Sequence, residues 1–162
     1  MKKLLTFVYL LTIVLANLAV LKWGPQAVLW VGFLLVGLDF TSRDGLHDLW
    51  RGKNLWRNMF LLILTGSLIT VVLNRGSLKI AIASTIAFLC AGIVDTLSYH
   101  FLRDKTKLIR INGSNVFSTL VDSFVFLTLA FGFPPMWLLV GKQFLVKVLG
   151  GFLWSLVLAR WK

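Results

Sequence analysis

Four polar residues form a stripe along one otherwise apolar segment of this sequence. Asn115, Ser118, Thr119 and Asp122 stand at positions i, i+3, i+4 and i+7, which share one face of an α-helix. If that helix crosses a membrane, an aspartate at its centre costs about 2.5–3.5 kcal/mol, and such residues usually mark function. The stripe favours a ligand cavity. The structural alternative is a hydrogen-bond network between helices, because Ser, Thr and Asn hold membrane helices together.

The last apolar segment carries a second polar pair. Gln143 and Lys147 stand at i and i+4, and Lys147 lies about a third to a half of the way along the segment. This position is too deep for its ammonium group to reach the surface easily, so the lysine needs a carboxylate partner. Asp122 on the preceding segment is the obvious candidate. A purely structural ion pair and a pair that also contacts a ligand both remain open.

A second buried aspartate is expected in the fourth apolar segment. Asp95 follows Ala83, Ala87 and Ala91 at intervals of four residues. Small residues in such a row let helices approach closely, which would hold Asp95 against a neighbouring helix rather than against lipid. Ligand contact and structural pairing are the two interpretations of this carboxylate.

Two further polar residues lie in the first two apolar segments. Asn17 stands near the outer end of the first. Asp39 stands near the inner end of the second, with Arg43 four residues later, so a local salt bridge is expected. The stretch 39–48 is dense in charge, which fits either an inner gate or a solvated helix end.

The usual signatures of enzymes are missing from the sequence. It contains no paired-histidine metal motif, no Gly-x-Ser-x-Gly and no phosphate-binding loop. Cys90 is in an apolar stretch and reads as a small buried hydrophobe, and His47 and His100 have no nearby cysteine or glutamate. Paired aspartates could act as acid and base, but no nucleophile accompanies them. We therefore expect no catalytic residue, no metal ion and no cofactor.

Composition shows what surrounds these residues. Of 162 residues, 58% are hydrophobic and 14% are charged, and the mean hydropathy is +0.86. A soluble domain has about 45–50% apolar and about 25% charged residues, and its core could not hide this much apolar surface. The sequence predicts an all-α integral membrane protein with a single domain over residues 1–162.

The apolar runs divide the chain into about six transmembrane helices. A span needs about 20 mainly apolar residues, and Gly, Pro and Asn mark the breaks. The expected helices are at about 4–21, 26–42, 57–73, 79–102, 114–133 and 136–159. Asp39 and Asp122 fall in corresponding helices of the two halves, which indicates a 3+3 inverted repeat, although the sequences around them barely match.

The basic residues predict the orientation of the chain. Lys and Arg gather in loops on the cytoplasmic side of membrane proteins. With the N-terminus in the cytoplasm, the outer side holds Lys22, Arg75 and Lys79, and the inner side holds the far larger set Lys2, Lys3, Arg43, Arg51, Lys53, Arg57, Arg103, Lys105, Lys107, Arg110, Arg160 and Lys162. We expect a multi-pass protein of the plasma (inner) membrane with both termini in the cytoplasm.

With these residues in view, the chain resembles the vitamin uptake transporter (VUT) family, the queuosine-precursor transporters. The resemblance covers nearly the whole chain, and its elements stand in family order. They are Asn17 in Ala16-Asn17-Leu18, Asp39 with Arg43 and Gly45, Asp95 in Ile93-Val94-Asp95, Asn115 with Ser118, Asp122 and Ser123, and Phe144 with Lys147 and Val148. The chain departs from the pattern at Arg43, where many relatives have glutamate.

The resemblance implies six helices and import of 7-cyano-7-deazaguanine or a related deazapurine for tRNA modification. A guanine-like edge offers N–H donors beside a carbonyl acceptor, which carboxylates and amides could match. The residues expected to bind substrate are Asn17, Asp39, Asp95, Asn115, Ser118, Asp122, Gln143 and Lys147.

Other functions fit the same composition. The chain could be the substrate-binding subunit of a multi-component vitamin importer, a membrane-embedded enzyme using the aspartates, or a structural or pore-forming protein. The expected partners are a small deazapurine and the lipid bilayer, with no nucleic acid. The small-residue faces fit packing within one chain or between copies of a homo-oligomer.

Overall fold

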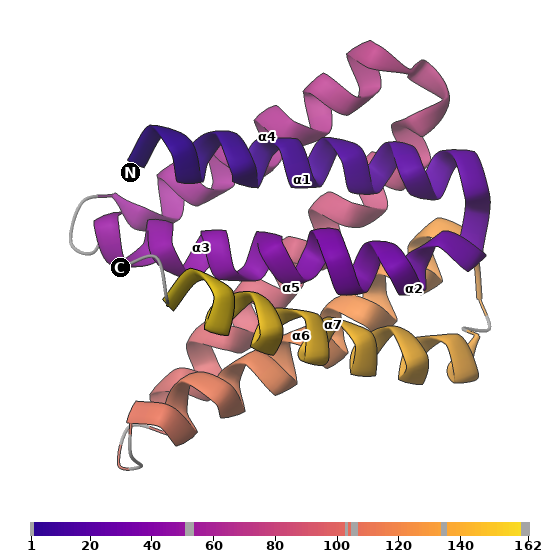
Figure 1. Cartoon of the computed structure of the whole chain (residues 1–162). Helices are drawn as coiled ribbons and strands as arrows, with labels where there is room; N and C mark the ends of the chain where they lie inside the picture. The colour runs from indigo at the N-terminus through magenta and orange to yellow at the C-terminus, as the bar shows by residue number, and fades with distance from the viewer. Residues whose placement is uncertain (1, 51–53, 103, 105–106, 134–135, 160–162) are drawn as a thin grey trace.

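The computed structural model describes residues 2–50, 54–102, 104, 107–133 and 136–159, and all regular structure in them is helical (Figure 1). The elements, in chain order, are α1 (Lys2–Trp23), η1 (Gly24–Gln26), α2 (Ala27–Val31), η2 (Gly32–Val36), α3 (Gly37–Trp50), α4 (Leu55–Leu73), η3 (Arg75–Ser77), α5 (Leu78–Phe101), α6 (Lys107–Phe131) and α7 (Trp137–Ala159). The expected all-α class is confirmed for this part of the chain.

Five stretches of the described residues are long and apolar enough to cross a membrane. They are Lys3–Phe40, Leu55–Leu73, Arg75–Ser98, Gly113–Phe131 and Trp137–Trp154. The expected count of six helices and the inverted repeat are therefore not confirmed and stay predictions. Large apolar side chains such as Val72 and Phe101, each 82% exposed, cover the outside of these helices, as expected of surfaces that face lipid.

The first of these stretches reverses direction within its length. A straight helix of its 38 residues would be about 57 Å long, nearly twice the apolar thickness of a bilayer. Gly24 adopts a φ of +65°, which glycine tolerates far better than other residues, and it begins η1, whose second residue is Pro25. The chain then returns through α2, η2 and α3 alongside α1 (Figure 1).

The second expected helix is longer than the sequence indicated. It was expected to end at residue 42, but α3 continues to Trp50. Leu46 and Trp50 are buried in a cluster with Tyr9 of α1 and Met59 of α4, so packing extends the helix through its charged stretch. Likewise, α6 begins at Lys107 rather than near residue 114.

Some expectations fall on residues outside the described part of the chain. Residues 51–53, between the expected helices 26–42 and 57–73, lie there, and so do residues 134 and 135, between the expected helices 114–133 and 136–159. So do Arg103, Lys105, Arg160 and Lys162 of the basic set used for the orientation. The location of both termini in the cytoplasm stays a prediction.

Helix α7 lies very close to η2 and α3 because glycines meet at the contact. A Cβ atom on Gly37 would lie 2.6 Å from the carbonyl carbon of Gly150, and a Cβ atom on Gly150 would lie 2.2 Å from the carbonyl oxygen of Phe33. A Cβ atom on Gly32 would lie 3.3 Å from Cγ of Lys147. This contact sets how deeply the side chains of α7 reach into the helix bundle.

The helix opposite α7 is irregular at the same level. Residues 32–36 (η2) form a π-helical turn, a feature that is frequent at functional sites. The indole N–H of Trp154 on α7 donates a hydrogen bond to the carbonyl oxygen of Leu34 at 2.9 Å. A polar partner from a neighbouring helix is how membrane proteins satisfy backbone groups that an irregular helix exposes.

We expect Gly150→Ala to destabilise the fold, because the added methyl group has no room against the backbone of Phe33. Overpacking of this kind costs about 1–3 kcal/mol, more than alanine gains over glycine in a helix. Gly151→Ala is the matched control, since the nearest atom to its Cβ is 4.0 Å away. Thermal unfolding in detergent micelles should show a lower midpoint for Gly150→Ala alone, and equal midpoints would contradict the contact.

Candidate functional site

A cavity lies between the helices at the middle depth of the membrane. It contains about 450 Å³ of empty space, part of it open to the outside. The lining residues are Thr12, Ile13, Ala16, Asn17 and Val20 of α1, Val28, Val31, Leu35, Val36 and Asp39 of the α2–η2–α3 helix, Ser84 and Phe88 of α5, Asp122 and Phe126 of α6, and Gln143 and Lys147 of α7.

The depth of the cavity follows from the positions of these residues along their helices. Thr12 is about 15 Å along α1 from Lys2, half of an apolar core of about 30 Å. Asp122 is the middle residue of the candidate span Gly113–Phe131. Binding sites of secondary transporters lie at this depth, often beside interrupted helices, and η2 interrupts the helix that carries Asp39.

The strongest interaction in the cavity is the ion pair between Asp122 and Lys147. The Lys147 Nζ atom is 2.5 Å from Asp122 Oδ2, and both side chains are 3% exposed. Lys147 also lies 5.8 Å from the centre of the Phe126 ring, within the range of a cation–π contact. The predicted partnership of these two residues is confirmed. It joins α6 to α7 and neutralises both charges where no water can solvate them.

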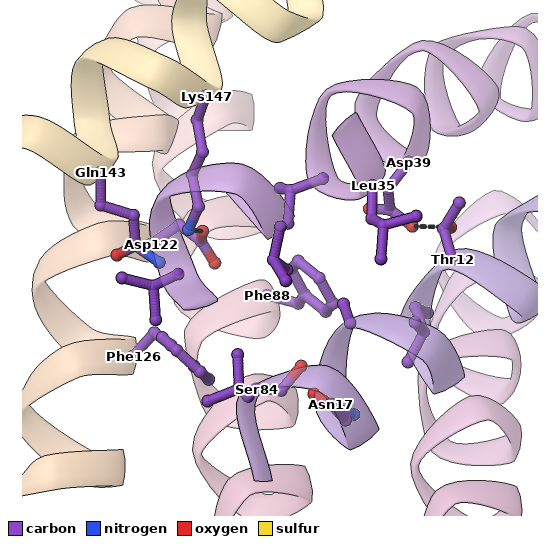
Figure 2. Close-up of a pocket in the computed structure, with 16 residues that line it drawn as sticks. Thr12, Asn17, Leu35, Asp39, Ser84, Phe88, Asp122, Phe126, Gln143 and Lys147 are labelled. Atoms are coloured by element: carbon purple, nitrogen blue, oxygen red, sulfur yellow. Dashed lines mark hydrogen bonds and ion pairs between the residues drawn. The ribbon is translucent and has the colours of Figure 1, made fainter. Parts of the chain in front are cut away.

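Two amides present polar atoms that have no partner in the structure. Asn17 and Gln143 are both buried, and neither Nδ2 of Asn17 nor Oε1 of Gln143 has a hydrogen-bond partner. An amide can offer a donor or an acceptor, because its oxygen and nitrogen can exchange places by rotation. Gln143 is beside the ion pair and Asn17 is beside Ser84, in different parts of the cavity (Figure 2).

The second carboxylate of the cavity, Asp39, has a different environment from Asp122. It is 2% exposed. Its Oδ1 atom lies 3.2 Å from the Thr12 hydroxyl oxygen, within hydrogen-bond distance, whereas its Oδ2 atom has no hydrogen-bond partner among the described residues. Figure 2 shows the Thr12–Asp39 contact on the opposite side of Phe88 from the Lys147–Asp122 pair.

Arg43 lies one turn beyond Asp39 and reaches another helix. Its guanidinium donates to Oδ1 of Asn115 on α6 at 3.4 Å and lies 4.9 Å from the centre of the Phe40 ring. Arg43 is 8% exposed, so its own side chain is buried within the helix bundle. The contact between α3 and α6 is on the inner side of the cavity in the predicted orientation.

The remaining predicted site residues do not line the cavity. Asn115 and Ser118 lie on α6 closer to its N-terminus than Asp122, and the Ser118 hydroxyl donates to the Asn115 carbonyl oxygen at 3.2 Å. Asp95 is half-buried on α5, and its Oδ1 atom has no partner. Ala83, Ala87 and Ala91 are buried as expected. A role of Asp95, Asn115 and Ser118 in binding stays a prediction.

The structure adds lining residues that the sequence did not single out. Thr12, Ser84, Phe88 and Phe126 are ordinary residues for membrane helices, so their types carry no signal. Helical spacing contained a weak signal, because Phe88 follows Ser84 and Phe126 follows Asp122 by four residues, which places each pair on one helix face. Phe88 and Phe126 give the cavity two aromatic walls, which suit a flat ring.

This set of side chains is suited to binding rather than to holding a metal ion. Among the described residues, no group of three or more His, Cys, Asp or Glu side chains could hold one. Apolar walls with a few polar groups are typical of sites that recognise small molecules. A buried ion pair and unpartnered amides can form hydrogen bonds with a ligand that carries both donors and acceptors.

We expect Lys147→Met to lower the free energy of unfolding by about 3–5 kcal/mol, because it leaves the Asp122 carboxylate buried without its partner. Replacing both residues, as in Lys147→Met with Asp122→Leu, should restore most of that loss, since an apolar pair needs no charge compensation. Unfolding in detergent micelles measures both effects.

The matched control is Lys142→Met, because Lys142 is an exposed lysine on the same helix. The stability of the Lys142→Met variant should stay close to that of the unchanged protein. A double variant no more stable than Lys147→Met alone would contradict the assignment of the loss to the unpaired carboxylate.

Comparison with known proteins places this chain in a family. A search of curated proteins and a search of solved structures each found no match. The family model described as "Putative vitamin uptake transporter" matches residues 4–160, nearly the whole chain. That range contains every residue that lines the cavity. The chain therefore belongs to the putative vitamin uptake transporter family.

Proposed function

We propose that this protein imports a queuosine precursor, 7-cyano-7-deazaguanine or a related deazapurine, across the plasma membrane for tRNA modification. The observation that carries the proposal is the cavity at mid-membrane depth, in which unpartnered polar atoms stand between apolar and aromatic walls. The family described as vitamin uptake transporters supports uptake of a small molecule.

The polar groups of the cavity complement a guanine-like edge. Such an edge places N–H donors beside a carbonyl acceptor. The carboxylate oxygens of Asp122 and a carboxyl oxygen of Asp39 can accept the N–H groups, while Lys147 or an amide of Gln143 or Asn17 can donate to the carbonyl. Phe88 and Phe126 can contact the two faces of the ring. A molecule without this edge would leave buried polar groups unpaired, which is a strong basis for rejecting it.

The arrangement of the helices also suits passage across the membrane. We propose that α1 and the α2–η2–α3 helix each cross the bilayer, which gives six crossings with both termini in the cytoplasm. Asp39 and Asp122 then stand on corresponding helices of the two halves, at the same depth and on the same cavity. Transporters built from two such halves bind their substrates where the halves meet.

We expect Gln143→Met to reduce uptake by about tenfold to a hundredfold without reducing stability. In the structure Gln143 Oε1 has no partner, so folding loses no hydrogen bond through it, whereas a bound substrate would lose one in a buried site. The measurement is uptake of labelled 7-cyano-7-deazaguanine by cells that cannot synthesise it, with the amount of membrane-inserted protein measured in parallel.

Gln26→Met is the matched control, since Gln26 is exposed in η1, and its uptake should equal that of the unchanged protein. Asp122→Asn should abolish most uptake as well. Full uptake by both Gln143→Met and Asp122→Asn would refute the assignment of this cavity as the binding site. Absence of uptake by the unchanged, correctly inserted protein would refute the substrate or indicate an importer subunit that needs an energising partner.

A further inference from the structure

The Thr12 hydroxyl is within hydrogen-bond distance of two oxygen atoms. Its Oγ1 atom lies 2.9 Å from the carbonyl oxygen of Tyr9 and 3.2 Å from Oδ1 of Asp39. A carbonyl and a carboxylate are both acceptors, but a hydroxyl carries a single hydrogen. The hydroxyl therefore cannot donate to both atoms at once.

The Thr12 hydroxyl hydrogen is directed to the Tyr9 carbonyl oxygen, because that contact is the shorter of the two. Threonine in a helix commonly donates to the carbonyl three or four residues earlier, and Tyr9 is three residues before Thr12. With its hydrogen on Tyr9, the hydroxyl presents a lone pair to Asp39. That second contact becomes a hydrogen bond when the Asp39 carboxyl group carries a proton and donates it to the Thr12 oxygen.

Among the described residues, Asp39 has no direct counter-ion. The groups that act on it are Tyr9 of α1, Arg43 of its own helix, Asp122 of α6 and Lys147 of α7. Lys147 is bound to Asp122, and the Arg43 guanidinium reaches Asn115. Oδ2 of Asp39 has no partner. An ionised carboxylate in this position would be buried at high cost, and a proton removes that cost.

We propose that Asp39 is the proton-binding site of a proton-coupled uptake cycle, with the proton held between its carboxyl group and the Thr12 hydroxyl. The inference rests on the proposed function, because it assumes that the cavity moves a substrate. A proton from water on the outer side adds to a carboxylate oxygen of Asp39, and the same O–H bond breaks when the proton leaves to water on the inner side. No bond of the substrate changes.

The position of Asp39 explains how proton and substrate binding would be linked. One oxygen of its carboxyl group contacts Thr12, and the group also lines the cavity. Substrate that contacts the carboxyl group closes it off from water, so the protonated form is favoured while the site is filled. A pH gradient can then drive accumulation of an uncharged molecule.

The test uses the full-length protein in liposomes with labelled 7-cyano-7-deazaguanine. Exchange of label at equal pH on both sides measures transport alone. Accumulation with an acidic outer solution, and acidification of a trapped pH dye when substrate is added, measure coupling. We expect exchange, accumulation that approaches about tenfold with a gradient of about one pH unit, and substrate-dependent acidification. Each additional pH unit permits about a further tenfold for one proton per substrate.

Variants of Thr12 test whether the coupled proton is held between Asp39 and the Thr12 hydroxyl. Thr12→Val removes the oxygen that accepts the proton of Asp39, so the midpoint of accumulation against pH should fall by about one pH unit or less. Thr12→Ser keeps the hydroxyl and should retain the original midpoint. If the hydroxyl instead donated to an ionised Asp39, Thr12→Val would raise the midpoint, and that result or an unchanged midpoint would overturn the proposal.

Failure of the coupling and failure of the proposed function give different results. Exchange that proceeds without any response to the pH gradient would overturn proton coupling and leave the proposed function intact. An Asp39→Asn protein that still accumulates substrate with the gradient would also overturn the assignment to Asp39. Absence of exchange by the unchanged protein would refute the proposed function and the coupling together.

Discussion

The hydrocarbon core of a membrane contains no water to solvate a charge, so each charged side chain there must find its partner inside the protein. Asp122 and Lys147 meet this requirement with each other at 2.5 Å. Lys147 can reach Asp122 because α7 lies against η2 and α3, where Gly37 and Gly150 allow their backbones to touch. The ion pair joins α7 to α6 and the glycine contact joins α7 to α3, so together they hold in place the helix that supplies Gln143 and Lys147 to the cavity.

Polar atoms without partners are rare inside folded proteins, and several in this chain line the same cavity. Asn17, Asp39 and Gln143 each contribute one. Were these atoms scattered through the bundle, each would simply reduce stability. Because they surround one space at mid-membrane depth, a bound molecule can satisfy several of them at once. This grouping is the physical reason to interpret the cavity as a binding site and not as a packing defect.

The sequence predicted the parts of the site that depend on charge. A lysine as deep as Lys147 needs a carboxylate, and the neighbouring Asp122 was the obvious choice, which the structure confirms. Periodicity alone was less informative, because it identifies a helix face but not a depth. Asn115 and Ser118 share the face of Asp122, yet they lie beyond the cavity.

The remaining features arise from tertiary packing. Two such features are the π-helical turn at residues 32–36 and the contact of Gly37 with Gly150. Both involve segments far apart in the chain, so no local sequence pattern predicts them. The extension of α3 to Trp50 has the same origin, since Leu46 and Trp50 are held by α1 and α4. Thr12 and Phe88 were missed because threonine and phenylalanine are common in membrane helices and only their neighbours make them part of a site.

The charge balance of the cavity restricts what it can accept. Asp122 and Lys147 cancel each other, and with the proton that we propose on Asp39 the lining has no net charge. A nucleotide would bring phosphate charges into this space without a free cation among the lining residues to receive them, which is costly at this depth. An uncharged base brings hydrogen-bonding groups and no charge. The same neutrality that makes the cavity tolerable in the membrane therefore favours a free base over its nucleotide.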